Sequence, residues 1–131
     1  MNVLTIIAAA TSVAPPQLTG ENFYAAVEAE RVLLFFFSPD CGHCRAMMPV
    51  WKELGEVPLP GGCKLASLDA TTEPAIAERF EVYGYPTLLL IDAGRMFEFR
   101  GERTVGALTA FVDGNSPQGF RSETSRTLPS R

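Results

Sequence analysis

Short apolar runs, separated by turn residues and by segments of helical periodicity, organise this sequence. The run Val32–Phe37 is continuous and rich in aromatic side chains, which is typical of a strand buried on both faces of a sheet. Cys63–Leu68 and Thr87–Ile91 predict two further buried strands. Ala93-Gly94 joins the last of these runs to Met96–Phe99, and this spacing predicts a hairpin.

Helical patterns fill the intervals between the apolar runs. We expect helices over Gly20–Glu30, Arg45–Glu56, Thr72–Phe80 and Thr104–Asp113, and a short edge strand at Leu18-Thr19. Thr19 and Thr104 can each accept a hydrogen bond from the open amides of a first helical turn. The first two buried strands are expected to be parallel because a helix lies between them. The chain therefore predicts an α/β fold, with a central mixed β-sheet and helices on both faces.

The candidate chemistry lies in Cys41-Gly42-His43-Cys44, between the first buried strand and the next helix. A sulfur at the start of a helix meets unpaired amides and the positive end of the macrodipole, which favour a thiolate. We therefore predict that Cys41 is the attacking sulfur and that Cys44, one turn later, is the resolving sulfur. A structural disulfide or half of a zinc site remains an alternative for such a pair. Beyond the pair, the chain offers zinc only Cys63 and His43, and we expect Cys63 to be buried and not catalytic.

The segment Phe36–Arg45 resembles the active-site segment of protein disulfide isomerase catalytic domains, a branch of the thioredoxin superfamily. The resemblance spans roughly residues 16–113, and its further motifs are Met48–Trp51, Leu68–Thr71, Val82–Thr87 and Phe99–Arg103. It implies a thioredoxin-like fold and a thiol-disulfide oxidoreductase. It also implies that the Cys41–Cys44 disulfide is the redox group and that no other cofactor and no metal are needed.

The resemblance assigns roles to several residues besides the two cysteines. His43, next to Gly42 inside the motif, is expected to stabilise the Cys41 thiolate as a cation or hydrogen-bond donor. Pro86 matches the cis-proline of the family, so Tyr85, Pro86 and Thr87 are expected to bind the substrate polypeptide. Arg103 matches an arginine that stabilises the thiolate of the resolving cysteine.

Three positions depart from the family pattern. Phe35 stands where the family usually has a buried glutamate, and Ser67 stands where it usually has the paired lysine. Cys44 then lacks its usual proton acceptor, so we expect slower resolution of mixed disulfides. Asp40 replaces a tryptophan before the first cysteine, and its carboxylate is expected to oppose ionisation of Cys41.

The two ends of the chain differ from the domain, which we place at residues 15–113. Residues 1–14 contain an apolar stretch followed by small residues, which predicts a secretory signal peptide, with a first strand as the alternative. Residues 114–131 are rich in Ser, Arg, Pro and Gly without an apolar period, so we expect a disordered tail. The last four residues, Leu128–Arg131, do not form a retention signal of the Lys-Asp-Glu-Leu type.

Composition narrows the possible partners. The formal net charge is −4 and no basic cluster is present, which argues against nucleic-acid binding. The apolar stretch near the start is too short for a membrane span. We expect cysteine-containing polypeptides as substrates, and an upstream redox partner or glutathione as the recharging partner, in the lumen of the endoplasmic reticulum. A cytosolic thioredoxin-like reductase and a binding or chaperone module with impaired turnover are the alternative functions.

Overall fold

The computed structural model describes residues 15–29, 31–114 and 126–129. The strands within these residues form a single mixed sheet. The strand order within these residues is β1-β3-β2-β4-β5-β6. The central strand β2 pairs in parallel with β3 and antiparallel with β4. The strands are β1 (Gln17–Leu18), β2 (Val32–Phe37), β3 (Lys64–Asp69), β4 (Thr87–Asp92), β5 (Arg95–Glu98) and β6 (Arg126–Thr127). The predicted mixed sheet, parallel pair and hairpin are therefore confirmed.

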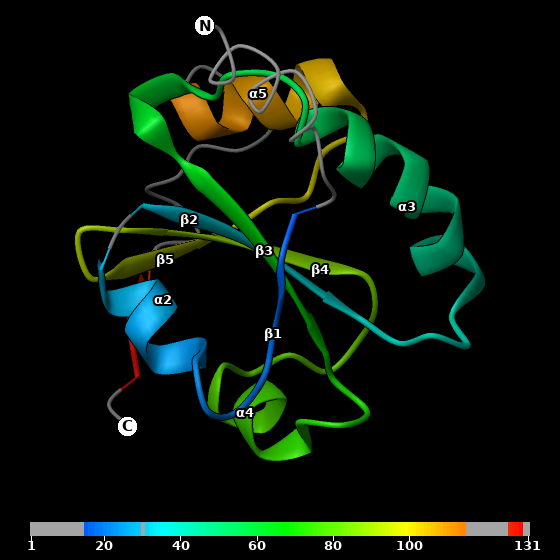
Figure 1. Cartoon of the computed structure of the whole chain (residues 1–131), viewed down its shortest axis with the longest axis vertical. Helices are drawn as coiled ribbons and strands as arrows, with labels where there is room; N and C mark the ends of the chain where they lie inside the picture. Colours follow the sequence, from blue (N-terminus) through cyan, green and yellow to red (C-terminus); the bar gives the residue numbers. More distant parts are fainter. Residues whose placement is uncertain (1–14, 30, 115–125, 130–131) are drawn as a thin grey trace, which may run out of the picture.

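Helices cover both faces of the sheet, as the sequence predicts (Figure 1). The helices α2 (Phe23–Ala29) and α4 (Pro74–Arg79) lie on one face, and α3 (Gly42–Leu54) and α5 (Val105–Asp113) lie on the other. Successive side chains of β2 alternate between the two layers, because side chains of a strand point to opposite faces. Every residue of β2 is consequently buried, which explains the continuous apolar run.

Local hydrogen bonds shift the helix boundaries from the predicted ones. The helix α3 begins at Gly42 rather than Arg45, because Cys41 already caps its first turn. The helix α2 begins at Phe23 rather than Gly20, since residues 19–22 form a turn in which Asn22 Oδ1 accepts the Thr19 amide at 2.7 Å. The predicted cap of α5 is confirmed, with the amide of Ala107 donating to Thr104 Oγ1 at 3.1 Å.

The end of the chain adds one strand that the sequence did not predict. Residues 126–127 pair antiparallel with β5, and the amide of Leu128 donates to the carbonyl of Gly94 at 3.0 Å. The half-buried Leu128 packs against the layer of α2 and α4, which stabilises this short strand. This corrects the expected disorder at residues 126–129. The rest of the predicted tail beyond Gly114, and the predicted signal peptide at 1–14, lie outside the described residues.

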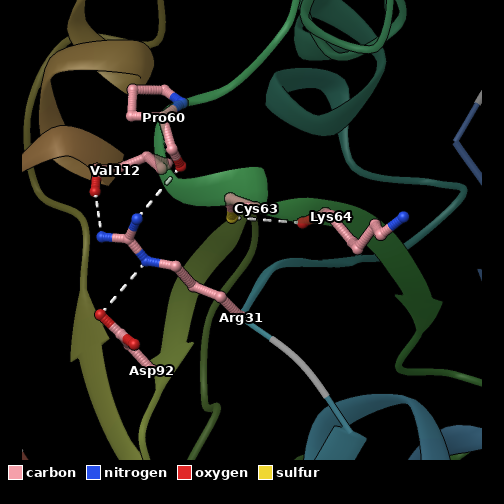
Figure 2. A network of polar contacts seen from close by, with 6 residues as sticks. All are labelled: Arg31, Pro60, Cys63, Lys64, Asp92 and Val112. Carbon is pink, nitrogen blue, oxygen red and sulfur yellow. Dashed lines mark hydrogen bonds and ion pairs between the residues drawn. The ribbon is translucent and has the colours of Figure 1, made fainter.

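Arg31, directly before β2, joins three segments of the chain (Figure 2). The cysteine pair follows the other end of β2. Its guanidinium donates to the carbonyls of Pro60 and Val112, and its Nε lies 3.2 Å from Asp92 Oδ2 in an ion pair. The Val112 carbonyl belongs to the last turn of α5, where acceptors lack helical partners. A side chain at Gly61, whose φ is +67°, would collide with this guanidinium. Arg31 therefore fixes α5 and the loop before β3 to the sheet.

Replacing Arg31 with methionine should lower the free energy of unfolding by about 2 kcal/mol, because the variant loses charge-assisted hydrogen bonds to two carbonyls. Urea denaturation of the full chain measures this change. Arg100→Met is the matched control, since the Arg100 ion pair with Glu98 is exposed and should contribute less than about 0.5 kcal/mol. Equal stability of the two variants would contradict the role assigned to Arg31.

Candidate functional site

Cys41 is the N-cap residue of α3. Its backbone is extended, with φ −83° and ψ 119°, and its Sγ accepts a hydrogen bond from the amide of Cys44 at 3.2 Å. The Cys41 carbonyl accepts the amide of Arg45 at 3.0 Å, which is the first hydrogen bond of the helix. The sulfur therefore takes the place that a serine or aspartate oxygen usually occupies at a helix start.

These contacts lower the pKa of Cys41 below its ordinary value. The largest cause is the hydrogen bond from the thiol of Cys44, and the backbone amides of Cys44 and His43 and the charge of Arg103 add to it. Desolvation opposes them without reversing the direction. Cys41 is half-buried, and its Sγ lies 3.5 Å from the carbonyl oxygen of Tyr85. A low pKa on an accessible sulfur is the signature of a reactive cysteine.

Cys44 has the opposite environment. Its side chain is fully buried in the layer between the sheet and the helices α3 and α5. Burial, followed by the hydrogen bond to Cys41, raises the pKa of Cys44 to about 11, although the backbone amide of Ser38 and the charge of Arg103 favour its thiolate. The two sulfurs therefore differ in both access and acidity, as the predicted roles of attacking and resolving cysteine require.

The loop before β4 carries the predicted substrate-binding residues to the same site. The Tyr85–Pro86 peptide bond is cis, and the hydrogen bond between Cys41 Sγ and the Tyr85 carbonyl places this loop against the reactive sulfur. The hydroxyl of Thr87 donates to the carbonyl of Gly84 at 2.7 Å and closes the turn. Tyr83 is 79% exposed and belongs to the same loop, although the sequence analysis did not select it. The sequence Tyr-Gly-Tyr directly before Pro86 was the signal that could have identified Tyr83 as part of the site.

His43 and Arg103 are placed differently relative to the sulfurs. The backbone amide of His43 helps to ionise Cys41, while its side chain is exposed to solvent. The expected role of the imidazole stays a prediction. The charge of the exposed Arg103 lowers the pKa of both cysteines, in the direction that the sequence predicts. Gly42 is the first residue of α3, and a side chain there would meet no atom within 4 Å.

Two of the three departures from the family pattern are neighbours in the sheet. Phe35 and Ser67 are register partners across β2 and β3, and both are buried. The Phe35 ring lies 5.2 Å from the ring of Trp51, centroid to centroid, so it fills the layer that also buries Cys44. Asp40 is exposed, and the net pKa shift of Cys41 is downward despite its carboxylate.

The described residues contain no group of three or more His, Cys, Asp or Glu side chains able to hold a metal ion. Cys63 is buried directly before β3, close to Arg31, and its thiol donates to the carbonyl of Lys64 at 3.4 Å (Figure 2). Because β2 and β3 are parallel, Cys63 lies at the opposite end of these strands from the cysteine pair, which follows β2. None of the helices in the described ranges has the length and apolar character needed to cross a bilayer.

Comparisons with known proteins agree with this geometry. The thioredoxin family model matches residues 14–114. The chain belongs to the thioredoxin family. Among its relatives, the human protein disulfide-isomerase A4 is 41% identical over 100 residues, which cover 68% of this chain and 15% of the relative. A thioredoxin domain-containing protein of Theileria parva is 42% identical over 81 residues, which cover 61% of this chain and 36% of the relative.

Solved structures give the same assignment. The first thioredoxin domain of mouse protein disulfide-isomerase A4 superposes with a TM-score of 0.68 at 30% identity, and the match covers 77% of this chain and 75% of that one.

 The zinc-bound form of human ERp44 superposes with a TM-score of 0.69 at 28% identity, over 77% of this chain and 30% of that chain. The chain thus spans about a sixth to a third of the length of the curated relatives named above, and it corresponds to one thioredoxin domain within them.

Arg103→Met should raise the pKa of Cys41, because it removes a positive charge that favours the thiolate. The rate of Cys41 alkylation by iodoacetamide, followed on its peptide by mass spectrometry between pH 5 and about 10, reports this pKa. In the wild type the rate should level off at a lower pH than for a free cysteine. Arg79→Met, on the other face of the sheet, is the matched control and should leave the curve unchanged. Identical curves for all three proteins would contradict the role of Arg103.

The raised pKa of Cys44 predicts a loss of stability at alkaline pH. The unfolded thiol loses its proton near pH 9, while the folded thiol keeps it up to about pH 11, so rising pH stabilises the unfolded chain in this window. The reduced wild type should therefore lose about 2 kcal/mol more than Cys44→Ala between pH 8 and about 11. Urea denaturation at several pH values measures the difference, and parallel curves would show that Cys44 titrates normally.

Proposed function

We propose that this chain is a thiol-disulfide oxidoreductase that forms, reduces or isomerises disulfides in cysteine-containing polypeptides of the secretory pathway. The observation that carries the proposal is the asymmetry of the pair. Cys41 is an accessible helix cap with a lowered pKa, and Cys44 is buried behind it with a raised pKa. Thiolates are the nucleophiles of disulfide exchange, so the first sulfur is suited to attack, and the second lies where it can close a disulfide with the first.

In the reducing direction, the Cys41 thiolate attacks one sulfur of a substrate disulfide. The Cys41–substrate bond forms, the substrate disulfide breaks, and the departing sulfur takes up a proton. To complete the two-electron reduction, Cys44 must lose its proton and attack Cys41, which forms the Cys41–Cys44 disulfide and frees the reduced substrate. Oxidation runs through the same steps in reverse. The pair itself supplies the two electrons, so we propose that no other cofactor takes part.

The cis-proline loop is the proposed contact for the substrate backbone. Tyr85 and Pro86 lie beside the reactive sulfur, and Thr87 fixes the turn, so a polypeptide presented to Cys41 would run along this loop. The exposed Tyr83 adds apolar surface to the same loop. An upstream redox partner or glutathione would reset the pair after each cycle, as a reductant after substrate reduction and as an oxidant after substrate oxidation.

The similarity to protein disulfide-isomerase A4 supports the lumen of the endoplasmic reticulum as the compartment of action. A signal peptide over residues 1–14 would direct the chain there. A binding module with impaired turnover is the second candidate function, and the burial of Phe35 and Ser67 in the layer of Cys44 favours it.

Cys41→Ser should abolish insulin reduction and the reactivation of scrambled ribonuclease, because it removes the attacking sulfur. Cys63→Ser is the matched control, since Cys63 lies at the opposite end of the parallel strands β2 and β3 from the pair, and it should keep most of the wild-type activity. Turnover that survives in Cys41→Ser would overturn the proposed function. A wild-type chain that binds unfolded polypeptides but is inactive in both assays would instead support the binding module.

A further inference from the structure

Cys44 is enclosed by a layer that offers almost no polar partner. The buried hydrophobic residues that line this layer include Phe35, Phe37, Trp51 and Leu88. Among the described residues, the buried polar or charged residues are Ser67 and Asp69. The hydroxyl of Ser67 is no base near neutral pH, and Asp69 Oδ1 already accepts hydrogen bonds from the amide and hydroxyl of Thr71, at 2.8 and 2.6 Å.

The indole nitrogen of Trp51 gives independent evidence for this apolar environment. Trp51 Nε1 is buried and has no hydrogen-bond partner among the described residues. A buried indole N–H normally finds an acceptor, because leaving it without one costs about 1–3 kcal/mol. The neighbouring ring of Phe35 cannot accept as a carboxylate would. Among the described residues, no carboxylate or carbonyl accepts a hydrogen bond from this indole, and the buried carboxylate of Asp69 is already engaged with Thr71. We infer that Cys44 has no side chain beside it that readily takes its proton.

When a substrate is bound to Cys41 as a mixed disulfide, the ionisation of Cys44 and the departure of Cys41 are affected differently. In the mixed disulfide, Cys41 carries no charge and donates no hydrogen bond, so its effects on Cys44 are lost. The burial of Cys44, which is the largest cause of its raised pKa, remains. The Cys44 thiolate needed for internal attack is accordingly scarce. Cys41 is in contrast a good leaving group, because the helix start stabilises its thiolate.

We propose that the substrate held on Cys41 is released mainly by a small external thiol, such as glutathione, rather than by Cys44. This inference rests on the proposed function. The external thiolate attacks the sulfur of the substrate, and a new disulfide forms between the thiol and the substrate. The bond between the substrate and Cys41 breaks, and Cys41 leaves as a thiolate. The chain would thus hold its substrate until a thiol of the surroundings releases it.

The test uses the full reduced chain and a fluorescent peptide whose single cysteine is activated with thionitrobenzoate. Capture of the peptide by Cys41 releases the coloured thionitrobenzoate anion, which measures the first step. Non-reducing gels then follow the loss of peptide from the protein at pH 7, with and without glutathione. Without glutathione, the wild type and Cys44→Ser should keep the peptide for times that agree within about threefold. With glutathione, both should release it at rates proportional to the glutathione concentration.

Release from the wild type at least tenfold faster than from Cys44→Ser, without glutathione, would overturn the inference and leave the proposed function intact. Absence of thionitrobenzoate release from the wild type would overturn both. Cys41→Ser controls for reaction at the other cysteines and should capture no peptide.

A second set of variants tests the missing proton acceptor directly. Phe35→Glu places a carboxylate in the layer of Cys44 and should speed release without glutathione at least tenfold. Phe35→Gln is the matched control, because its amide is polar but cannot take a proton, and it should release as slowly as the wild type. The double variant Phe35→Glu with Cys44→Ser should also be slow. Circular dichroism verifies folding, and a folded Phe35→Glu variant without faster release would contradict the proposal.

Discussion

The hydrogen bond from the amide of Cys44 to the sulfur of Cys41 joins the fold of this chain to its chemistry. The same contact caps the helix α3 and, together with the hydrogen bond from the Cys44 thiol, lowers the pKa of Cys41. A helix start offers several unpaired amides, so a cysteine placed there is acidic without a dedicated base. The position of Cys41 directly after the central strand keeps that sulfur at the surface, where a polypeptide can reach it.

The layered sheet determines the different character of the second sulfur. The helix α3 packs across the face formed by Leu33, Phe35 and Phe37. Cys44 lies about one helical turn after Cys41, and its side chain is therefore buried in this layer. Burial then disfavours its thiolate. The aromatic side chain of Phe35 and the hydroxyl of Ser67 leave the layer without a buried charge pair, which favours packing and disfavours proton transfer.

The sequence was sufficient to predict the main elements because their apolar patterns are strong. The run of β2 and the threonine cap of α5 are local signals, and the structure confirms both. The start of α3 and the strand β6 depend on contacts that the patterns do not reveal. A sulfur that caps a helix has no common sequence signature, and β6 forms through pairing with β5 and the packing of Leu128. Likewise, only the three-dimensional structure shows that the indole nitrogen of Trp51 has no hydrogen-bond partner within the described part of the chain.

Separate titration of the two cysteines tests the central claim most directly. The reduced chain, labelled with carbon-13 at the cysteine β-carbons, can be followed by nuclear magnetic resonance across neutral and alkaline pH. The asymmetry described above predicts that Cys41 ionises below the ordinary range of a thiol and that Cys44 ionises near pH 11. Two cysteines that titrate together in the ordinary range would contradict it.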